Sequence, residues 1–115
     1  MTQVKEEIDR FVQEVLNRYK EVISTIILFG SASRGDLTEE SDIDFLIVTH
    51  NAKRLDLLKK ITRVATRMVL EYGRPISTKV YDLDQYEYLK RLETPFMKNI
   101  EREGEILWKR KQRKR

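Results

Sequence analysis

Two short stretches of this chain hold side chains that could bind a metal ion and a phosphate. In the first, Asp42 and Asp44 flank Ile43 at the start of a run that is otherwise apolar. Because side chains alternate between the two faces of a strand, both aspartates would lie on one face, with their Cα atoms about 7 Å apart. Two carboxylates on one face repel each other, and a divalent cation is the usual compensation. The pair therefore predicts a site for Mg²⁺ or Mn²⁺, which both prefer oxygen ligands.

In the second stretch, Gly30 and Ser31 follow an apolar run, and ten residues separate Ser31 from Asp42. Gly30 has no Cβ, so a phosphate could approach the backbone there, and Ser31 adds a hydroxyl and an N–H group. Arg34 carries a guanidinium group whose shape matches phosphate oxygens. Together with the aspartates, these residues predict a metal–triphosphate site for phosphoryl or nucleotidyl transfer.

The composition restricts the chemistry and the kind of protein. The chain has 115 residues, 40% hydrophobic and 37% charged, which predicts one soluble domain. No cysteine and a single histidine argue against thiol catalysis, iron–sulfur clusters, Cys-ligated zinc and a Ser-His-Asp triad. The longest apolar run, residues 26–29, is far too short to span a bilayer, and no signal peptide precedes it. We therefore expect a cytoplasmic protein with no membrane segment.

The positive charge is concentrated at the C-terminus. The net charge is +4, but residues 109–115 hold six basic side chains, so residues 1–108 carry 17 basic and 19 acidic groups. We therefore expect residues 1–108 to form the domain and residues 109–115 to be a disordered basic tail. Such a tail could make weak, salt-sensitive contact with nucleic acid.

Hydrophobic periodicity predicts the elements that position these residues. Apolar and β-branched runs predict three strands, at 22–29, 42–48 and 76–81, and a short last strand at 106–108. Apolar residues at helical spacing predict a first helix that ends near Lys20 and a long helix that Asn51 caps and Gly73 ends. Asp84 and Glu87 have the spacing of a capping box, which begins a further helix. Thr94-Pro95 interrupts that helix and starts the next.

The predicted order is α-β-β-α-β-α-α, which favours a small α/β or α+β domain with a mixed sheet covered by helices. The first two strands, on either side of the polar loop 34–41, are expected to be neighbours in the sheet. The helix between strands 42–48 and 76–81 predicts a right-handed crossover between parallel strands.

The motif of Gly30-Ser31, ten residues, and then Asp42-x-Asp44 resembles the minimal nucleotidyltransferases of the DNA polymerase β superfamily. The resemblance extends over nearly the whole chain except the tail. It implies the polymerase-β-type fold, with Asp42 and Asp44 as Mg²⁺ ligands and Gly30 and Ser31 as triphosphate-binding residues. It also implies transfer of a nucleoside monophosphate from a nucleoside triphosphate, here ATP, with release of pyrophosphate.

Active members of the superfamily usually place a third carboxylate on the next strand. Alternation along residues 76–82 directs Ser77, Lys79 and Tyr81 toward the site, so Lys79 stands where the acid is expected. Asp82, at the end of the strand, is our candidate for this third catalytic carboxylate.

The resemblance also implies a partner. Similar domains often pair with a small helical HEPN-type toxin and act as its antitoxin, some of them by adenylylating a toxin tyrosine. A lysine at the position of the third acid supports an alternative, a non-catalytic module that binds a nucleotide or masks the partner by contact. A third possibility is that the basic tail binds nucleic acid.

Overall fold

The computed structural model describes residues 2–50 and 53–111, and its elements follow the expected order with two short additions, a 3₁₀ turn at Lys20–Val22 and the four-residue helix α2. The helices are α1 (Thr2–Tyr19), α2 (Ser31–Arg34), α3 (Arg54–Tyr72), α4 (Leu83–Leu92) and α5 (Pro95–Glu103). The strands are β1 (Ile23–Phe29), β2 (Ile43–Thr49), β3 (Ile76–Asp82) and β4 (Glu105–Lys109). The predicted strands and the main helices are thus confirmed.

The four strands form one mixed sheet in the order β3-β2-β1-β4. β1 is antiparallel to both β2 and β4, whereas β2 and β3 are parallel and joined through α3. The expected neighbours and the expected crossover are therefore confirmed. At one end of the sheet Asp44 pairs with Phe29 on β1 and with Ser77 on β3. We call this the Asp44 end of the sheet.

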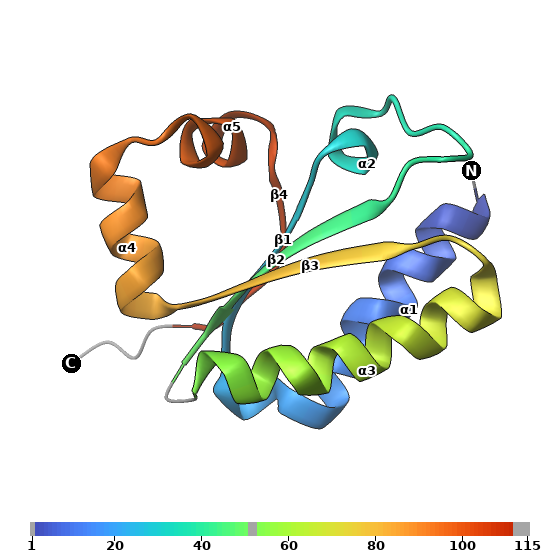
Figure 1. Cartoon of the computed structure of the whole chain (residues 1–115), viewed down its shortest axis with the longest axis horizontal. Helices are drawn as coiled ribbons and strands as arrows, with labels where there is room; N and C mark the ends of the chain where they lie inside the picture. Colours follow the sequence, from blue (N-terminus) through green and yellow to red (C-terminus); the bar gives the residue numbers. More distant parts are fainter. Residues whose placement is uncertain (1, 51–52, 112–115) are drawn as a thin grey trace.

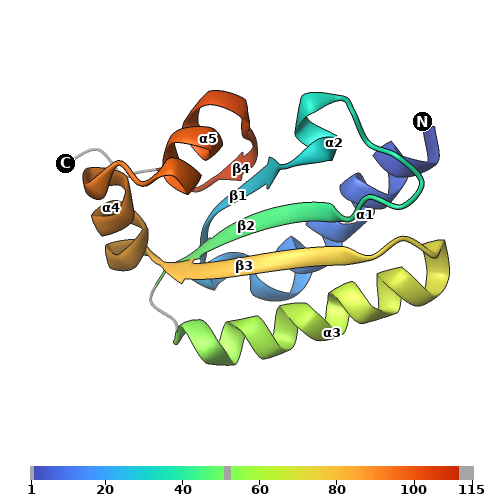
Figure 2. The same cartoon turned by 45° about the horizontal axis from the view of Figure 1, so that its top comes forward.

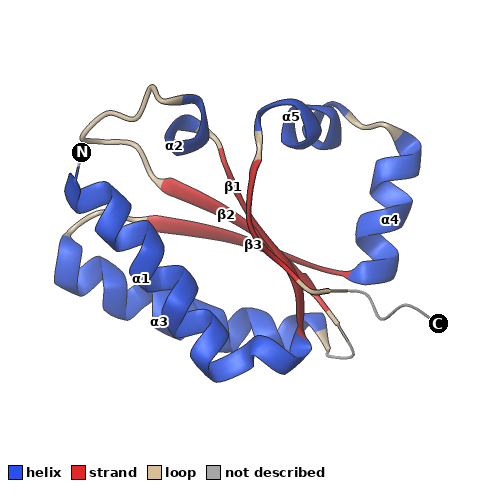
Figure 3. Cartoon of the chain, turned by 180° about the vertical axis from the view of Figure 1, so that it is seen from behind, coloured by secondary structure: helices blue, strands red, loops and turns tan. Residues whose placement is uncertain are grey.

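One face of the sheet carries the main hydrophobic core. Helices α1 and α3 lie side by side against this face, and α4 and α5 lie on the other side of the sheet (Figure 1; from behind in Figure 3). Phe11 on α1 stacks on Phe45 on β2 with ring centroids 4.4 Å apart, and both side chains are fully buried. Each such burial contributes roughly 2–3 kcal/mol, so this layer holds the sheet in place.

The second face of the sheet is less completely covered. Its buried cluster has three members, Ile27, Leu46 and Ile100, with aromatic side chains only partly buried around them. Helix α4 buries none of its residues completely. Figure 2 shows α4 and α5 together at the left of the view, with α5 next to β4. Asp44 lies on this second face, because its neighbours Ile43 and Phe45 belong to the main core.

One of the predicted helix caps is wrong, and another falls outside the described residues. Helix α4 begins one residue after Asp82, whose carboxylate accepts a hydrogen bond from the Gln85 N–H at 2.7 Å, so Asp82 and not Asp84 is the cap. At α3 the cap position is Lys53, without a side-chain hydrogen bond, and Asn51 lies outside the described residues. The predicted start of α5 is confirmed, because Thr94 Oγ1 accepts from the Met97 N–H at 3.2 Å with a proline in the first turn.

The domain extends beyond the boundary expected at residue 108. Lys109 belongs to β4, and the Arg110 N–H donates to the Ser24 carbonyl at 2.9 Å. The Arg110 guanidinium also donates to the Ile23 carbonyl at 3.0 Å and to the Lys20 carbonyl. The first two residues of the predicted tail are therefore part of the fold, and residues 112–115 lie outside the described part of the chain. Within residues 2–50 and 53–111, no helix is long and apolar enough to cross a membrane.

The Arg110 contacts give the first testable prediction. Arg110→Ala should lower the free energy of unfolding by about 1–3 kcal/mol, because it removes charge-assisted hydrogen bonds to two backbone carbonyls. Lys111→Ala removes the same charge from an exposed neighbour that forms no hydrogen bond with the described residues, so it should change stability little. Urea unfolding of both variants measures the difference, and equal stability of the two would contradict the packing of Arg110.

Candidate active site

The two aspartates are brought together with Gly30 at the Asp44 end of the sheet. Asp44 is the second residue of β2 and is partly buried, whereas Asp42 precedes the strand and is exposed. Gly30 directly follows β1, which pairs with β2 through Phe29 and Asp44. The expected juxtaposition of Asp42, Asp44 and Gly30 is thus what the backbone produces.

The backbone of Gly30 touches the carboxylate of Asp44. Gly30 has φ 74° and ψ −153°, a combination that is essentially restricted to glycine. A Cβ atom at this position would lie 2.3 Å from Asp44 Oδ2 and 3.2 Å from its Cγ. Gly30 is therefore needed twice, once for the turn from β1 into α2 and once to leave room for the carboxylate.

The electrostatics of Asp44 favour a nearby cation. Burial raises the pKa of Asp44, and the negative charge of Asp42 raises it further, while Lys79 and Arg34 oppose the shift. These opposing influences show that the two carboxylates and the two cationic side chains act on one another. A divalent ion would offset both the burial and the repulsion, and Mg²⁺ commonly uses one or two protein carboxylates together with substrate phosphates. The residues present therefore fit a divalent ion, which Asp42 and Asp44 would hold.

Helix α2 presents the phosphate-binding candidates beside the carboxylates. The Gly30 carbonyl accepts hydrogen bonds from the N–H groups of Ser33 and Arg34, both at 3.1 Å, so α2 turns tightly around Gly30. Ser31 begins this helix, and its N–H has no acceptor within the helix. Ser33 Oγ donates to the Glu103 carbonyl, which ties α2 to the end of α5.

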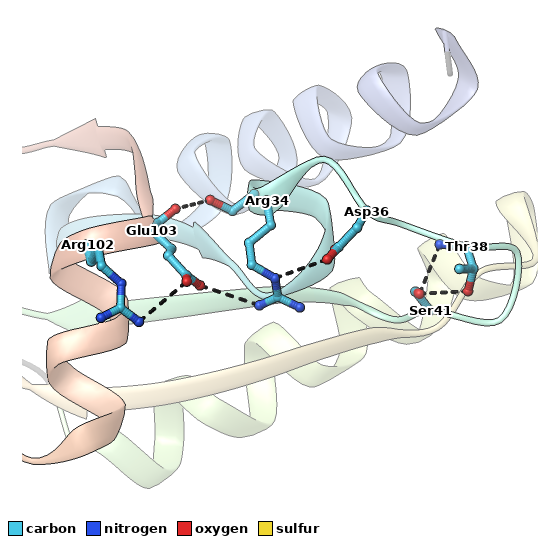
Figure 4. A network of polar contacts seen from close by, with 7 residues as sticks. Arg34, Asp36, Thr38, Ser41, Arg102 and Glu103 are labelled. Atoms are coloured by element: carbon cyan, nitrogen blue, oxygen red, sulfur yellow. Dashed lines mark hydrogen bonds and ion pairs between the residues drawn. The ribbon is translucent and has the colours of Figure 1, made fainter.

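Arg34 is held by two carboxylates (Figure 4). Its Nε lies 3.3 Å from Asp36 Oδ2 and its Nη1 lies 3.5 Å from Glu103 Oε2, and all three side chains are partly exposed. Exposed ion pairs contribute about 0–1 kcal/mol, so a phosphate could replace either carboxylate at small cost. Glu103 was missed by the reasoning from sequence, because no local pattern shows that the end of α5 meets α2.

Asp82 does not belong to this site, so its prediction as the third carboxylate is wrong. Asp44 pairs with Ser77, whereas Asp82 pairs with Thr49 at the opposite end of β2. Five residues along β3 correspond to about 17 Å. In addition, its carboxylate is used as the cap of α4. Within the described residues, no group of three or more histidine or acidic side chains could hold a metal.

Ser77 and Lys79 stand on β3 where the acid was expected. Their alternation with the buried Val80 directs them to the same face as Asp44, as predicted. The Lys79 Nζ lies 5.5 Å from the centroid of the Phe96 ring, which in turn packs edge-on against Phe29 with centroids 5.5 Å apart. These two aromatic side chains border the site beside Lys79. Their position could not be predicted from the sequence, because it depends on how α5 packs on the sheet.

A comparison of two glycine variants tests the close approach at Gly30. Gly30→Ala should lose about 1–3 kcal/mol of stability through backbone strain and should also displace the Asp44 carboxylate. Gly73, at the end of α3, has a similar φ of 82°, but nothing lies within 4 Å of a Cβ added there. Gly73→Ala should therefore lose only about 1–2 kcal/mol of stability. Measurement of stability together with Mg²⁺-dependent nucleotide binding separates them. Equal nucleotide binding by the two variants would refute the role of the Gly30–Asp44 contact in the site.

The raised pKa of Asp44 predicts the pH dependence of stability. The folded protein binds the Asp44 proton more tightly than the unfolded chain does, so ionisation of this carboxyl opposes folding as the pH rises through its folded-state pKa. Asp44→Asn, which is neutral throughout, should therefore raise the melting temperature of the metal-free protein at pH 7. The gain should vanish below about pH 3.9, where the wild-type carboxyl is protonated in both states. Melting curves from pH 3 to 8 check both parts, and a destabilised variant at pH 7 would contradict them.

Comparison with known proteins agrees with the geometry. A family model described as "Polymerase beta, Nucleotidyltransferase" matches residues 11–113. Two proteins of Methanocaldococcus jannaschii, each named "Putative protein adenylyltransferase", are similar in sequence. One is 37% identical over 101 residues, covering 88% of this chain and 94% of the relative. The other is 33% identical over 102 residues, covering 89% and 96%.

Solved structures share the fold at lower sequence identity. A toxin–antitoxin complex with AMP-PNP aligns with a TM-score of 0.57 at 22% identity, covering 88% of this chain and 73% of that one. A tri-AMPylated HEPN toxin in complex with MNT antitoxin from Shewanella oneidensis aligns with a TM-score of 0.51 at 17% identity, covering 94% and 73%. Since a family model covers nearly the whole chain and full-length relatives exceed 30% identity, this chain belongs to the polymerase β nucleotidyltransferase family.

Proposed function

We propose that this chain transfers AMP from ATP to a hydroxyl group of a partner protein and that the partner is a HEPN-type toxin, which the chain neutralises as its antitoxin. The observation that carries the proposal is the contact of Asp44 with Gly30, because it places a carboxylate pair beside the start of α2. The names of the sequence relatives and the toxin–antitoxin complexes among the similar folds support the choice of reaction and partner.

Each residue of the site has a distinct task in this reaction. When bound to Asp42 and Asp44, Mg²⁺ would neutralise phosphate charge and act as a Lewis acid. The N–H and hydroxyl of Ser31 bind phosphate oxygens, and the missing side chain of Gly30 leaves room for the Asp44 carboxylate beside them. Arg34 exchanges its exposed carboxylate partners for the triphosphate. These groups hold the α-phosphorus in line between the acceptor hydroxyl and the leaving pyrophosphate.

The chemical step forms one bond and breaks one. The acceptor oxygen attacks the α-phosphorus, and the bond from that phosphorus to the bridging oxygen of the β-phosphate breaks, which releases pyrophosphate. The one carboxylate on β3, Asp82, lies at the end of the strand far from Asp44 and cannot accept the hydroxyl proton, so in this proposal the proton passes to water. A positioned base is typically worth about 10²–10⁴ in rate, so transfer should be slow.

Lys79 favours a second candidate function, a non-catalytic module that binds the nucleotide or masks the partner by contact. The positive charge of Lys79 opposes the rise in the pKa of Asp44 and would repel a second metal ion. Such a module would neutralise its partner without modifying it. Contact of the basic C-terminus with nucleic acid stays a prediction, and Arg110 is already bonded to backbone carbonyls.

Binding of ATP by two aspartate variants tests the metal site. Asp44→Asn should weaken Mg²⁺-dependent binding by at least about 10- to 100-fold. Loss of a group that only orients a metal ligand already lowers metal affinity by this factor, and Asp44 is proposed as a ligand itself. Asp82→Ala should cost about 1 kcal/mol of stability through loss of the α4 cap and should leave binding unchanged. Calorimetry with and without Mg²⁺ measures both. Equal affinity with and without the ion would refute the assignment of Asp42 and Asp44 as ligands.

The same variants decide between transfer and masking. The wild type and Asp82→Ala, incubated with ATP, Mg²⁺ and a HEPN-type toxin, should add adenylyl groups to the toxin, and Asp44→Asn should add none. Intact-mass spectrometry detects the product. An unmodified toxin that is neutralised equally by the wild type and by Asp44→Asn would favour the masking module.

A further inference from the structure

Asp42 lies outside regular secondary structure, yet its two neighbours in the chain are both fixed. The Ser41 carbonyl accepts a hydrogen bond from Arg74 Nη1 at 2.7 Å. The Ile43 N–H donates to the Pro75 carbonyl at 3.0 Å. Two consecutive residues of the link between α3 and β3 thus hold the backbone on either side of Asp42.

Arg74 also closes the loop that leads to Asp42. The same Nη1 donates to the Thr38 carbonyl at 2.7 Å, so one nitrogen joins both ends of the turn 38–41. Within this turn the Thr38 N–H donates to Ser41 Oγ at 3.0 Å, and the two hydroxyl oxygens are 2.9 Å apart (Figure 4). The turn is closed by its own hydrogen bonds, and Arg74 attaches it to the body of the domain.

We propose that Arg74 is a positioning residue, which fixes the backbone around Asp42 so that this carboxylate meets the metal. The inference rests on the proposed function, because it assumes that Asp42 binds a divalent ion. It adds that the link between α3 and β3, which contributes no side chain to the proposed metal–phosphate site, determines the geometry of one of its ligands.

Three variants test the proposal. Arg74→Ala removes the hydrogen bonds to the turn, and Arg74→Lys keeps the charge without the planar fork. The control is Arg10→Ala, which removes an arginine that joins α1 to α3, through Glu71 and Tyr72, without touching the turn. Two quantities are measured well below the melting temperature: hydrogen exchange of residues 38–44, and the Mg²⁺ concentration that gives half-maximal ATP binding.

Arg74→Ala should speed exchange of residues 38–44 and raise the Mg²⁺ requirement by about tenfold or more, as expected for a group that orients a metal ligand. Arg74→Lys should recover part of both losses. Arg10→Ala should alter neither quantity.

The two measurements keep the inference separate from the proposed function. Unchanged exchange of residues 38–44 in Arg74→Ala would overturn the inference whether or not the protein binds ATP. Faster exchange with an unchanged Mg²⁺ requirement would show that Arg74 is only structural and would overturn it as well. Absence of ATP binding in the wild type would refute the proposed function, and exchange alone would then decide whether Arg74 orders the segment around Asp42.

Discussion

The carboxylate of Asp44 lies against the backbone of Gly30, where any side chain on residue 30 would overlap it, and the arrangement of the site follows from this contact. β1 must end at Phe29 so that Gly30 can take its unusual conformation, and the chain must then turn at once into α2. That turn sets the first N–H groups of α2 next to the carboxylate. The antiparallel register of β1 and β2 makes the contact possible, because it places Phe29 opposite Asp44.

The unequal covering of the two sheet faces explains where such a contact can exist. Helices α1 and α3 seal the first face with a core whose central residues are fully buried. The second face is covered by α5 and only loosely by α4, so polar and charged groups on it can still reach water or a ligand. Ionised carboxylates need this half-exposed setting, because complete burial would suppress their charge. One face of the sheet therefore provides most of the stabilising core, and the other carries the polar and charged side chains of the candidate site.

Much of the fold and of the site could be predicted from the sequence, because short-range patterns encode it. Strand alternation correctly directed Asp44, Ser77 and Lys79 to one face, and the order of elements gave the crossover. Asp82 was misassigned because the register of β3 against β2, which decides the distance to Asp44, has no local signature. Arg110 was taken for part of a solvated tail, since a run of basic residues looks the same whether or not one of them bonds to the backbone.

The edge strand β4 also has a kinetic consequence. β1 lies in the middle of the finished sheet, but one of its two neighbours is formed by residues 105–109, some eighty positions later in the chain. Closing so long a loop costs conformational entropy, and this cost comes before the stabilising contacts between β4 and β1 can form. During synthesis, β1 and β2 can pair while the other side of β1 still presents unsatisfied N–H and carbonyl groups. Until β4 emerges from the ribosome, the nascent chain exposes an apolar strand edge, and in this interval it is most open to association with other strands.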